Sequence, residues 1–408
     1  MKKDNYVMES MIATSSAGRS EKFLRELLPD SWPVLLGAFA SAYGTGLLAM
    51  LVLPFMISAT MNGLHLDEAQ AGLLGTCEFI GVMVSSLVAA PFIGKLPRKT
   101  LAVLGALIAI AGNVASIYQS SYDMLLILRP IVGLGCGMAL AAGNATVASA
   151  VNPEKLAAQM SILFVVLMVV AMEVFADVSA RWNHVGVYGA LALFMALLFV
   201  LTTLVPQRAD SKVAPSPGRP HAHAGLFTLP AALMLLAIFA FALRDTMMWA
   251  FAERIGQSAG FSPDGLGRLF SAQAVFGLLG PMAASAIGSR FGLKKPTLFG
   301  IFLTGVVTFT ILQSSQAKIP YTMAVMFISG TYFFALSYLT AVAAELDAEG
   351  RIVAASGGFL VAGVAVGPAI SGYLILHGGY GLSSWANMII VVLTFALLAI
   401  PLKKLSRA

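Results

Sequence analysis

The sequence predicts an all-α membrane protein in which twelve transmembrane helices form two pseudo-symmetric six-helix bundles. Three observations predict this architecture: the composition, twelve apolar runs of spanning length, and a polar break near the middle of the chain. Hydrophobic residues make up 58% of the 408 residues and charged residues 11%, whereas about a quarter of a soluble domain is charged. The mean hydropathy is +0.86. Lipid, rather than water, is therefore the main solvent of this chain.

The distribution of charge indicates which partners the protein meets. Lys and Arg outnumber Asp and Glu by 25 to 19, but the basic residues fall in short clusters between apolar runs. This pattern favours phospholipid head groups and argues against nucleic acid as a partner. The two cysteines, Cys77 and Cys136, each lie inside an apolar run, which excludes a disulfide framework.

Each predicted span is long enough to cross a bilayer as a helix. A spanning helix needs about 20 mostly apolar residues. Helix is required because lipid cannot form hydrogen bonds with free backbone groups. The twelve segments that meet the requirement are 33–57, 69–93, 101–118, 124–150, 156–178, 187–205, 229–251, 266–288, 296–313, 320–344, 352–376 and 384–401.

The basic residues also predict how the chain is oriented. If the N-terminus lies inside, most Lys and Arg residues fall on the inner side, and the outer side holds Arg181, Arg254, Arg268 and Lys318. This asymmetry predicts a multi-pass protein of the cytoplasmic (inner) membrane with both termini in the cytoplasm. Residues 1–32 are polar and lack the compact apolar core of a signal peptide, so we interpret them as a cytosolic tail.

The chain divides near its centre. Residues 206–228 are rich in Pro, Ser, Gly and charge, which is typical of a linker. We therefore expect a cytosolic linker there between an N-terminal bundle at 33–205 and a C-terminal bundle at 229–402, followed by a cytosolic tail at 403–408.

The two halves share residues at equivalent positions. Gly72 and Gly267 lie 195 residues apart, and the same spacing separates Glu78 from Gln273. Parallel repeats of six helices are the architecture expected of a transporter whose halves rock about a central site. The repeats therefore point to a carrier with its site between the two bundles.

Two loops carry a family resemblance. The loop after the second span reads APFIGKLPRK (90–99), and the eighth span ends in SAIGSRFGLK (285–294). Both resemble the loop Gly-x-x-x-Asp-Arg-x-Gly-Arg-Arg/Lys of the major facilitator superfamily, although its acidic residue is replaced by Gly94 and Ser289. The resemblance implies gating roles for Lys95, Arg98 and Arg290. The alternative is that these basic residues only fix the topology.

The fourth and eleventh spans extend the resemblance. Arg129 is followed by three glycines at spacings of two residues, which resembles the family's arginine motif associated with proton coupling. A buried arginine needs a partner, so an ion pair that only holds the bundle together is the alternative. In the eleventh span Gly367 and Pro368 permit close contact and bending, and we expect them to act in gating. The fifth span lacks the Gly-Pro motif of the family's drug exporters, which argues against that subgroup.

Carboxylates inside the apolar runs are candidates for proton coupling. We assign this role to Glu78 and Arg129, and to Glu173 and Asp177, which share one helix face. The alternatives are a static pairing of Glu78 with Arg129 or Arg244, and an exposed outer rim for the other two carboxylates.

The resemblance also implies a substrate site. In this family the first, fourth, seventh and tenth helices line a central cavity. Aromatic rings together with arginines suit an anionic or aromatic organic solute, although Tyr and Trp also act as packing or interface anchors. The substrate-binding candidates are Tyr43, Asn144, Arg244, Asp245, Trp249, Tyr332 and Tyr338.

These patterns predict a secondary active transporter that acts as a monomer on a small organic solute. We expect proton coupling, no cofactor and no metal, because the chain contains no nucleotide-binding loop and no metal-binding motif. Import is favoured by the missing exporter motif. The alternatives are drug or metabolite efflux by proton antiport, an integral membrane enzyme acting on lipids, and a sensor that transports nothing.

Overall fold

The computed structural model describes residues 28–89, 92, 96–208, 228–347 and 351–405. All regular elements in these ranges are helices, as the sequence predicts. Nine of the described helices are long and apolar enough to cross a membrane. The two longest each contain two of the predicted spans, and the first predicted span is divided into shorter pieces. The predicted N-terminal tail up to residue 27, most of the linker and Lys95 lie outside the described residues.

The N-terminal half begins with a broken helix. The first predicted span continues beyond residue 57, and it consists of α2 (Trp32–Phe39), the π-helical segment η1 (Ala40–Gly46), α3 (Leu48–Leu51) and α4 (Leu53–Leu64). Pro54 lies in the first turn of α4, and it cannot donate the backbone hydrogen bond that would continue the preceding helix. Gly46 allows η1 to approach α7, because a Cβ atom at this glycine would lie 2.7 Å from Leu140 Cβ.

Four further helices complete this half: α5 (Glu68–Ala89), α6 (Arg98–Ile117), α7 (Tyr122–Ala148) and α8 (Pro153–Thr202). The last of these contains the predicted fifth and sixth spans. They are separated at Asn183, whose φ of 50° and ψ of −138° are not helical. Asparagine is one of the residues that most readily adopt a positive φ.

The C-terminal half has the same plan. It consists of α9 (Leu229–Trp249), α10 (Ala252–Ser258), α11 (Pro263–Phe276), α12 (Leu279–Ile287), α13 (Lys294–Gln313), α14 (Lys318–Leu346) and α15 (Arg351–Leu405). The last two predicted spans are merged in α15 and separate at Gly379, whose φ is 67°. Only glycine adopts such a conformation without strain. The breaks at Asn183 and Gly379 occupy corresponding places in the two halves.

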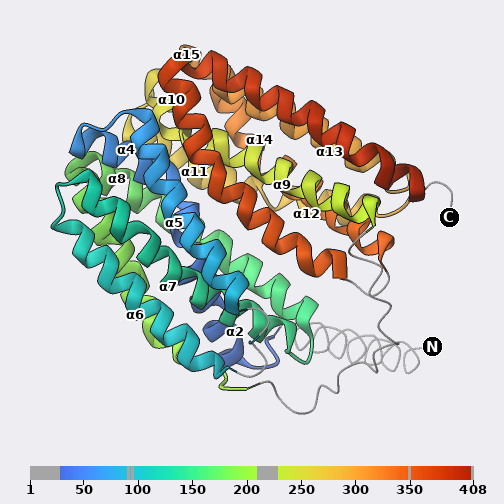
Figure 1. Cartoon of the computed structure of the whole chain (residues 1–408), viewed down its shortest axis with the longest axis horizontal. Helices are drawn as coiled ribbons and strands as arrows, with labels where there is room; N and C mark the ends of the chain where they lie inside the picture. Colours follow the sequence, from blue (N-terminus) through green and yellow to red (C-terminus); the bar gives the residue numbers. More distant parts are fainter. Residues whose placement is uncertain (1–27, 90–91, 93–95, 209–227, 348–350, 406–408) are drawn as a thin grey trace, which may run out of the picture.

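The halves meet along two helix pairs, α5 with α15 and α8 with α11. Figure 1 shows the first pair running side by side across the molecule. A Cβ atom at Gly72 of α5 would meet the carbonyl oxygen of Pro368, and one at Gly267 of α11 would lie 2.9 Å from Ala176 Cβ. These two glycines, which the sequence relates by the 195-residue repeat, therefore make equivalent contacts between the halves.

Both contacts lie at one end of the molecule, which we call the closed end. It contains the end of α4, all of α10 and the first turns of α5 and α11. Ser271 Oγ of α11 also donates a hydrogen bond to the carbonyl oxygen of Val169 in α8 at 3.0 Å. On the α5 side, the backbone N–H of Ala369 donates to Thr76 Oγ1 at 3.0 Å. Thr76 and Ser271 are again 195 residues apart, so the closed end is built symmetrically.

Candidate functional site

A cavity of about 360 Å³ lies between the two halves. It extends from the closed end toward the end where α8 and α15 begin, as far as Ser161 and Val361. The wall is mostly apolar and carries two serine hydroxyls. Its aromatic residues are Tyr43, Phe79, Phe164, Trp249, Tyr332 and Phe333.

Asp245 is the only Asp, Glu, Lys or Arg among the described residues that line this cavity. It is half-buried on α9, and its Oδ1 atom has no hydrogen-bond partner within the described part of the chain. Asp245 thus lines the cavity while its buried Oδ1 atom lacks a hydrogen bond, which is costly for an ionised carboxylate and is relieved by a proton.

Trp249 and Tyr332 are held firmly in the cavity wall. The Trp249 indole N–H donates to the carbonyl oxygen of Met50 at 3.2 Å, across the two halves. The ring of Tyr332 stacks on Phe241, with centroids 5.0 Å apart. Such rings offer flat apolar surfaces whose position is fixed before a solute binds.

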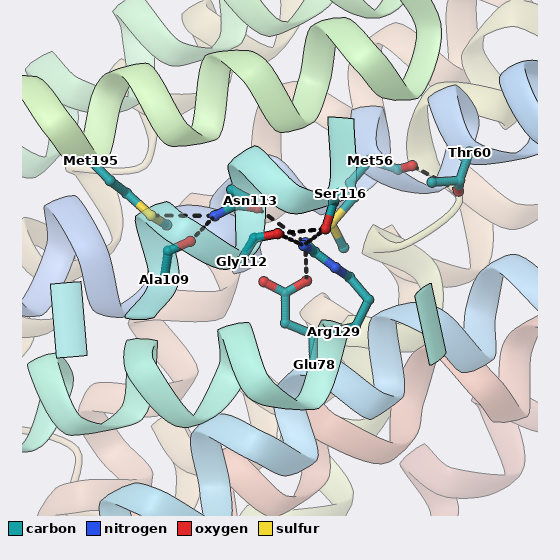
Figure 2. Close-up of polar contacts among 9 residues, drawn as sticks. All are labelled: Met56, Thr60, Glu78, Ala109, Gly112, Asn113, Ser116, Arg129 and Met195. Atoms are coloured by element: carbon teal, nitrogen blue, oxygen red, sulfur yellow. Dashed lines mark hydrogen bonds and ion pairs between the residues drawn. The ribbon is translucent and has the colours of Figure 1, made fainter. Parts of the chain in front are cut away.

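A second polar site lies inside the N-terminal half (Figure 2). Arg129 of α7 and Glu78 of α5 are both completely buried, with Nη1 and Oε2 3.5 Å apart. The guanidinium also donates to Asn113 Oδ1 at 3.1 Å, to Ser116 Oγ and to the carbonyl oxygen of Gly112 at 3.4 Å. These three acceptors belong to α6, so the site joins three helices.

Glycine brings the helices of this site together. A Cβ atom at Gly133 of α7 would clash with the carbonyl oxygen of Glu78, so α5 and α7 approach as closely as their backbones permit. On the far side, the guanidinium carbon of Arg129 lies 4.3 Å from the ring centroid of Tyr188. Neither member of the ion pair lines the central cavity, whereas Phe79, next to Glu78 on α5, does.

Arg244 is buried inside the C-terminal half rather than in the cavity wall. Its Nη1 donates to Thr308 Oγ1 of α13 at 3.4 Å, and its carbonyl oxygen accepts from Asn387 Nδ2 at 2.7 Å. Its guanidinium carbon lies 4.9 Å from the ring centroid of Phe241. Arg244 and Asp245 are neighbours, but successive residues on a helix point about 100° apart, so one faces the bundle and the other the cavity.

The cavity brings together four of the seven predicted substrate-binding residues: Tyr43, Asp245, Trp249 and Tyr332. The other three lie elsewhere. Arg244 points into its bundle, as described above, and Asn144 is exposed on α7. Tyr338 donates to the carbonyl oxygen of Gly288 at 2.9 Å and lines a separate pocket between α12 and α14. Their roles in binding stay predictions.

The remaining predicted proton-coupling residues lie at the closed end. Glu173 is exposed on α8, and Asp177 accepts from Arg181 Nε at 2.6 Å in an exposed ion pair. These exposed positions are compatible with the alternative interpretation of the two carboxylates, in which they form an exposed outer rim. Their proposed role in coupling stays a prediction.

The predicted gating residues are spread over both ends of the molecule. Arg98 donates to Ser149 Oγ at 2.5 Å, which ties the start of α6 to the end of α7, and Arg290 is exposed. Gly367 approaches α9, where an added Cβ atom would lie 2.9 Å from Thr246 Cβ. Pro368 contacts Gly72 across the halves, as described above.

The sequence interpretation missed one buried carboxylate. Glu253 lies on α10 with 1% of its surface exposed, just beyond the predicted end of the seventh span. The adjacent Arg254 was assigned to the outer side. The available signal was the apolar stretch 247–252 before the pair together with Ile255 after it, which is compatible with a further helical turn. Within the described part of the chain, no group of three or more His, Cys, Asp or Glu residues is arranged to hold a metal.

Comparison with known proteins decides the family. The model of the Major Facilitator Superfamily matches residues 34–242 and 233–407. The chain belongs to the major facilitator superfamily. Its members are secondary transporters rather than enzymes, and the resemblance predicted from the two loops and the fourth span is confirmed.

Solved structures of this superfamily share the fold. A mutant form of the nucleoside transporter NupG superposes with a TM-score of 0.71, covering 90% of this chain and 99% of that chain at 14% identity. A D-xylose-proton symporter superposes with a TM-score of 0.68, covering 89% and 96% at 14% identity. At this level of identity the likeness extends to the fold alone, and it confirms the predicted architecture.

Two curated relatives within the superfamily carry a named solute. The chain is 29% identical over 150 residues to the 4-hydroxybenzoate transporter PcaK of Pseudomonas putida, covering 35% of this chain and 33% of that protein. It is 28% identical over 130 residues to PcaK of Pseudomonas aeruginosa, covering 32% and 29%. The matched segments therefore span about a third of each relative's length.

Proposed function

We propose that this protein is a proton-coupled transporter that carries a small aromatic solute through the central cavity by alternating access. The observation that carries the proposal is the cavity wall, whose described residues include six aromatic side chains and one carboxylate, that of Asp245. The volume of about 360 Å³ falls within the usual range of small-molecule pockets, about 300–1,000 Å³. The named solute of the two curated relatives, 4-hydroxybenzoate, is also aromatic.

The orientation predicted from the basic residues gives this conformation a direction. With both termini in the cytoplasm, the closed end faces outward and the cavity extends toward the cytoplasm. We propose that solute binds between Trp249 and Tyr332, and that Asp245 exchanges a proton or accepts a hydrogen bond from the solute. The two halves then rock about this site, opening the closed end and closing the other.

A second candidate function is export of aromatic cations by proton antiport. Asp245 favours it, because a lone carboxylate in an apolar wall attracts a protonated amine more strongly than it attracts an acid. Neither Arg129 nor Arg244 lines the cavity, so an aromatic acid would find no cation among the described lining residues in this conformation.

A matched pair of solutes tests both candidates. Purified protein in proteoliposomes is given 4-hydroxybenzoate or 4-hydroxybenzylamine, which share a ring and a hydroxyl but carry opposite charges. We expect solute movement that depends on an imposed pH gradient and that is absent for the ring-saturated analogue of the same charge. Equal movement in empty liposomes, or equal movement of the saturated analogue, would contradict an aromatic carrier.

The variant Asp245→Asn separates the two candidates. If the carboxylate binds an amine, the variant loses transport of 4-hydroxybenzylamine and retains any transport of the acid. If the carboxylate carries only the coupling proton, the variant exchanges solute across the membrane but no longer accumulates it in response to the pH gradient.

A further inference from the structure

A buried polar cluster occupies the closed end, apart from the cavity and from the Arg129 site. Its centre is Glu253 of α10, whose Oε1 accepts from Gln257 Nε2 at 2.8 Å and from Ser179 Oγ at 3.5 Å. Ser58 of α4 lies beside the same carboxyl group. Within the described residues, Glu253 Oε2 and Ser58 Oγ are both buried and lack a hydrogen-bond partner.

The cluster bridges the two halves of the transporter. Ser58 and Ser179 belong to the N-terminal half, and Glu253 and Gln257 to the C-terminal half. Beside it, Arg254 Nη1 donates to Asn62 Oδ1 at 2.9 Å, again across the halves. When the closed end opens during alternating access, these contacts must separate, and water then reaches the carboxyl group.

Among the described residues, no cation forms an ion pair with Glu253, although Arg254 is close enough to act on its charge. Arg254 is on the same helix, but its guanidinium is directed to Asn62 at the exposed edge. Tyr321 of α14 faces the carboxyl group, and its hydroxyl is occupied as a donor to the carbonyl oxygen of Ala252 at 2.6 Å. Tyr380 of α15 interacts electrostatically with Tyr321. An ionised carboxylate in this buried position would lack a cationic partner, which is costly.

A proton on Glu253 removes a buried negative charge that has no ion-pair partner among the described residues. Protonated Oε2 becomes a donor, and Ser58 Oγ is an acceptor beside it. The carboxyl group is then neutral, and a hydrogen bond to Ser58 satisfies Oε2. Buried polar groups in folded proteins are nearly always satisfied in this way.

We propose that Glu253 is a proton-binding site of the transport cycle, loaded while the closed end is shut and emptied when the halves separate there. On opening, the O–H bond of the carboxyl group breaks, the proton passes to water, and the hydrated carboxylate keeps the negative charge. Closing requires the proton to return. This inference rests on the proposed transport function, since it assigns one step of that cycle, but its tests need no solute.

The first test measures the proton directly. Infrared difference spectra between acid and alkaline pH are recorded on the full chain in nanodiscs, for the wild type, Glu253→Gln and Asp264→Asn. The last of these is the matched control, because Asp264 is an exposed acid in the first turn of α11 at the same end. We expect the Glu253→Gln spectrum to lose one carboxylic-acid carbonyl band that the control retains. Identical spectra for all three proteins would overturn the proposal.

The second test measures the link to opening. A cysteine replaces Ser271, which is buried between α8 and α11, in a chain whose native Cys77 and Cys136 are changed to Ser and Ala. In this parent, the rate of reaction with a water-soluble maleimide should rise with pH more steeply than ionisation of the thiol alone requires, because the closed end opens as the proton leaves. In Glu253→Gln, the rate should rise only as the thiol ionises. The same pH dependence in both proteins would overturn the proposal.

A second, milder variant tests the proposal even if Glu253→Gln does not fold. Ser58→Ala removes the acceptor of the proposed hydrogen bond and leaves the carboxyl group in place. Because Ser58 interacts with the carboxyl group, its loss should change the pH at which the reporter becomes reactive. An unchanged midpoint would overturn the proposal. Failure of aromatic solutes to move in liposomes would contradict the proposed function without altering any of these three results.

Discussion

Glu78 and Arg129 form an ion pair inside the N-terminal bundle, with Oε2 and Nη1 3.5 Å apart and both side chains fully shielded from solvent. The pair lies behind the cavity wall, and it joins α5 to α7 while Nη1 and Nη2 of Arg129 also donate to acceptors on α6. A buried pair of this kind adds little net stability compared with well-packed apolar residues, but removal of one partner leaves the other charge uncompensated. Its geometry therefore predicts a strong asymmetry between single and double substitutions.

The first prediction concerns this asymmetry. Arg129→Met should destabilise the protein by about 3–5 kcal/mol, because the Glu78 carboxylate is left buried without a cation. The double variant Glu78→Gln, Arg129→Met should recover most of that loss. Thermal unfolding in detergent measures both. As a control, Arg181→Met breaks the exposed pair with Asp177 and should cost less than about 1 kcal/mol. Equal losses in the single and double variants would contradict the pairing.

The fold followed from the sequence because its main determinants are local. Apolar runs of spanning length and a polar break at 206–228 predict the helices and the two halves without knowledge of any contact. The predicted spans were wrong where a helix is interrupted, because the hydropathy pattern does not change at such an interruption. The first span breaks at Val52, whose φ and ψ are −95° and 13°, two residues before Pro54, and a hydropathy pattern does not report such a break.

The site was harder to predict because it depends on how each helix is rotated. The sequence placed Glu78 beside either Arg129 or Arg244, and the choice requires knowing which face of α5 meets which neighbour. Adjacent residues on a helix point about 100° apart, so Arg244 and Asp245 must face different neighbours. Which of the two would face the cavity follows only from the packing of α9 against α13 and α15.

The second prediction tests the close approach of α5 and α7. Gly133→Ala should destabilise the protein by about 1–3 kcal/mol, because the new Cβ atom would clash with the carbonyl oxygen of Glu78 and overpack the interface. Gly189→Ala is the matched control. A Cβ atom at Gly189 would meet only Ile117 Cδ1, at 3.8 Å, so the helix propensity of alanine should leave stability unchanged or raised by up to about 1 kcal/mol. Similar melting temperatures for both variants would contradict the packing.

The third prediction uses tryptophan fluorescence to locate the solute. Of the four tryptophans, Trp249 lines the cavity, whereas Trp32, Trp182 and Trp385 are 54%, 58% and 60% exposed. A transported aromatic solute should change the emission of the wild type as it binds. Trp249→Phe should abolish that change while retaining an aromatic ring in the wall. A full response in Trp249→Phe would place the solute elsewhere.

The fourth prediction concerns an ion pair at the end opposite the closed end. Lys155 Nζ and Asn152 Nδ2 each donate to Asp30 at 2.8 Å. The hydrogen bond from Lys155, followed by that from Asn152, lowers the pKa of Asp30 below its usual value of 3.8. Because the folded-state pKa is depressed, the stabilisation is fully present above pH 3.8 and is lost as pH falls through the folded-state pKa.

Asp30→Asn should therefore lower the melting temperature slightly at pH 7, and the difference from wild type should vanish in acid. The pair is exposed, so the effect is small. Lys155→Gln should behave in the same way, and the double variant should resemble either single variant at pH 7. Additive effects of the two substitutions, or a difference that grows toward acid pH, would show that the residues do not interact.

The last prediction tests the symmetry of the closed end. Gly72 and Gly267 occupy equivalent positions in the two halves, and each permits a contact that a side chain would obstruct. Gly72→Val and Gly267→Val should each overpack that contact and destabilise the conformation in which this end is shut by about 1–3 kcal/mol. The conformation in which this end is open should not be affected. The equilibrium should shift toward opening by about 5- to 150-fold, seen as faster maleimide reaction of the cysteine reporter at position 271.

Gly381→Ala is the control for both variants. It lies on α15, the helix that Gly72 contacts, and no atom lies within 4 Å of a Cβ added there, so the reporter should react at the parental rate. The two valine variants should match one another because the contacts they disturb are related by the repeat. If only one of them accelerates the reaction, the two interfaces do not open together, and a rigid rocking of the halves would be the wrong description of the motion.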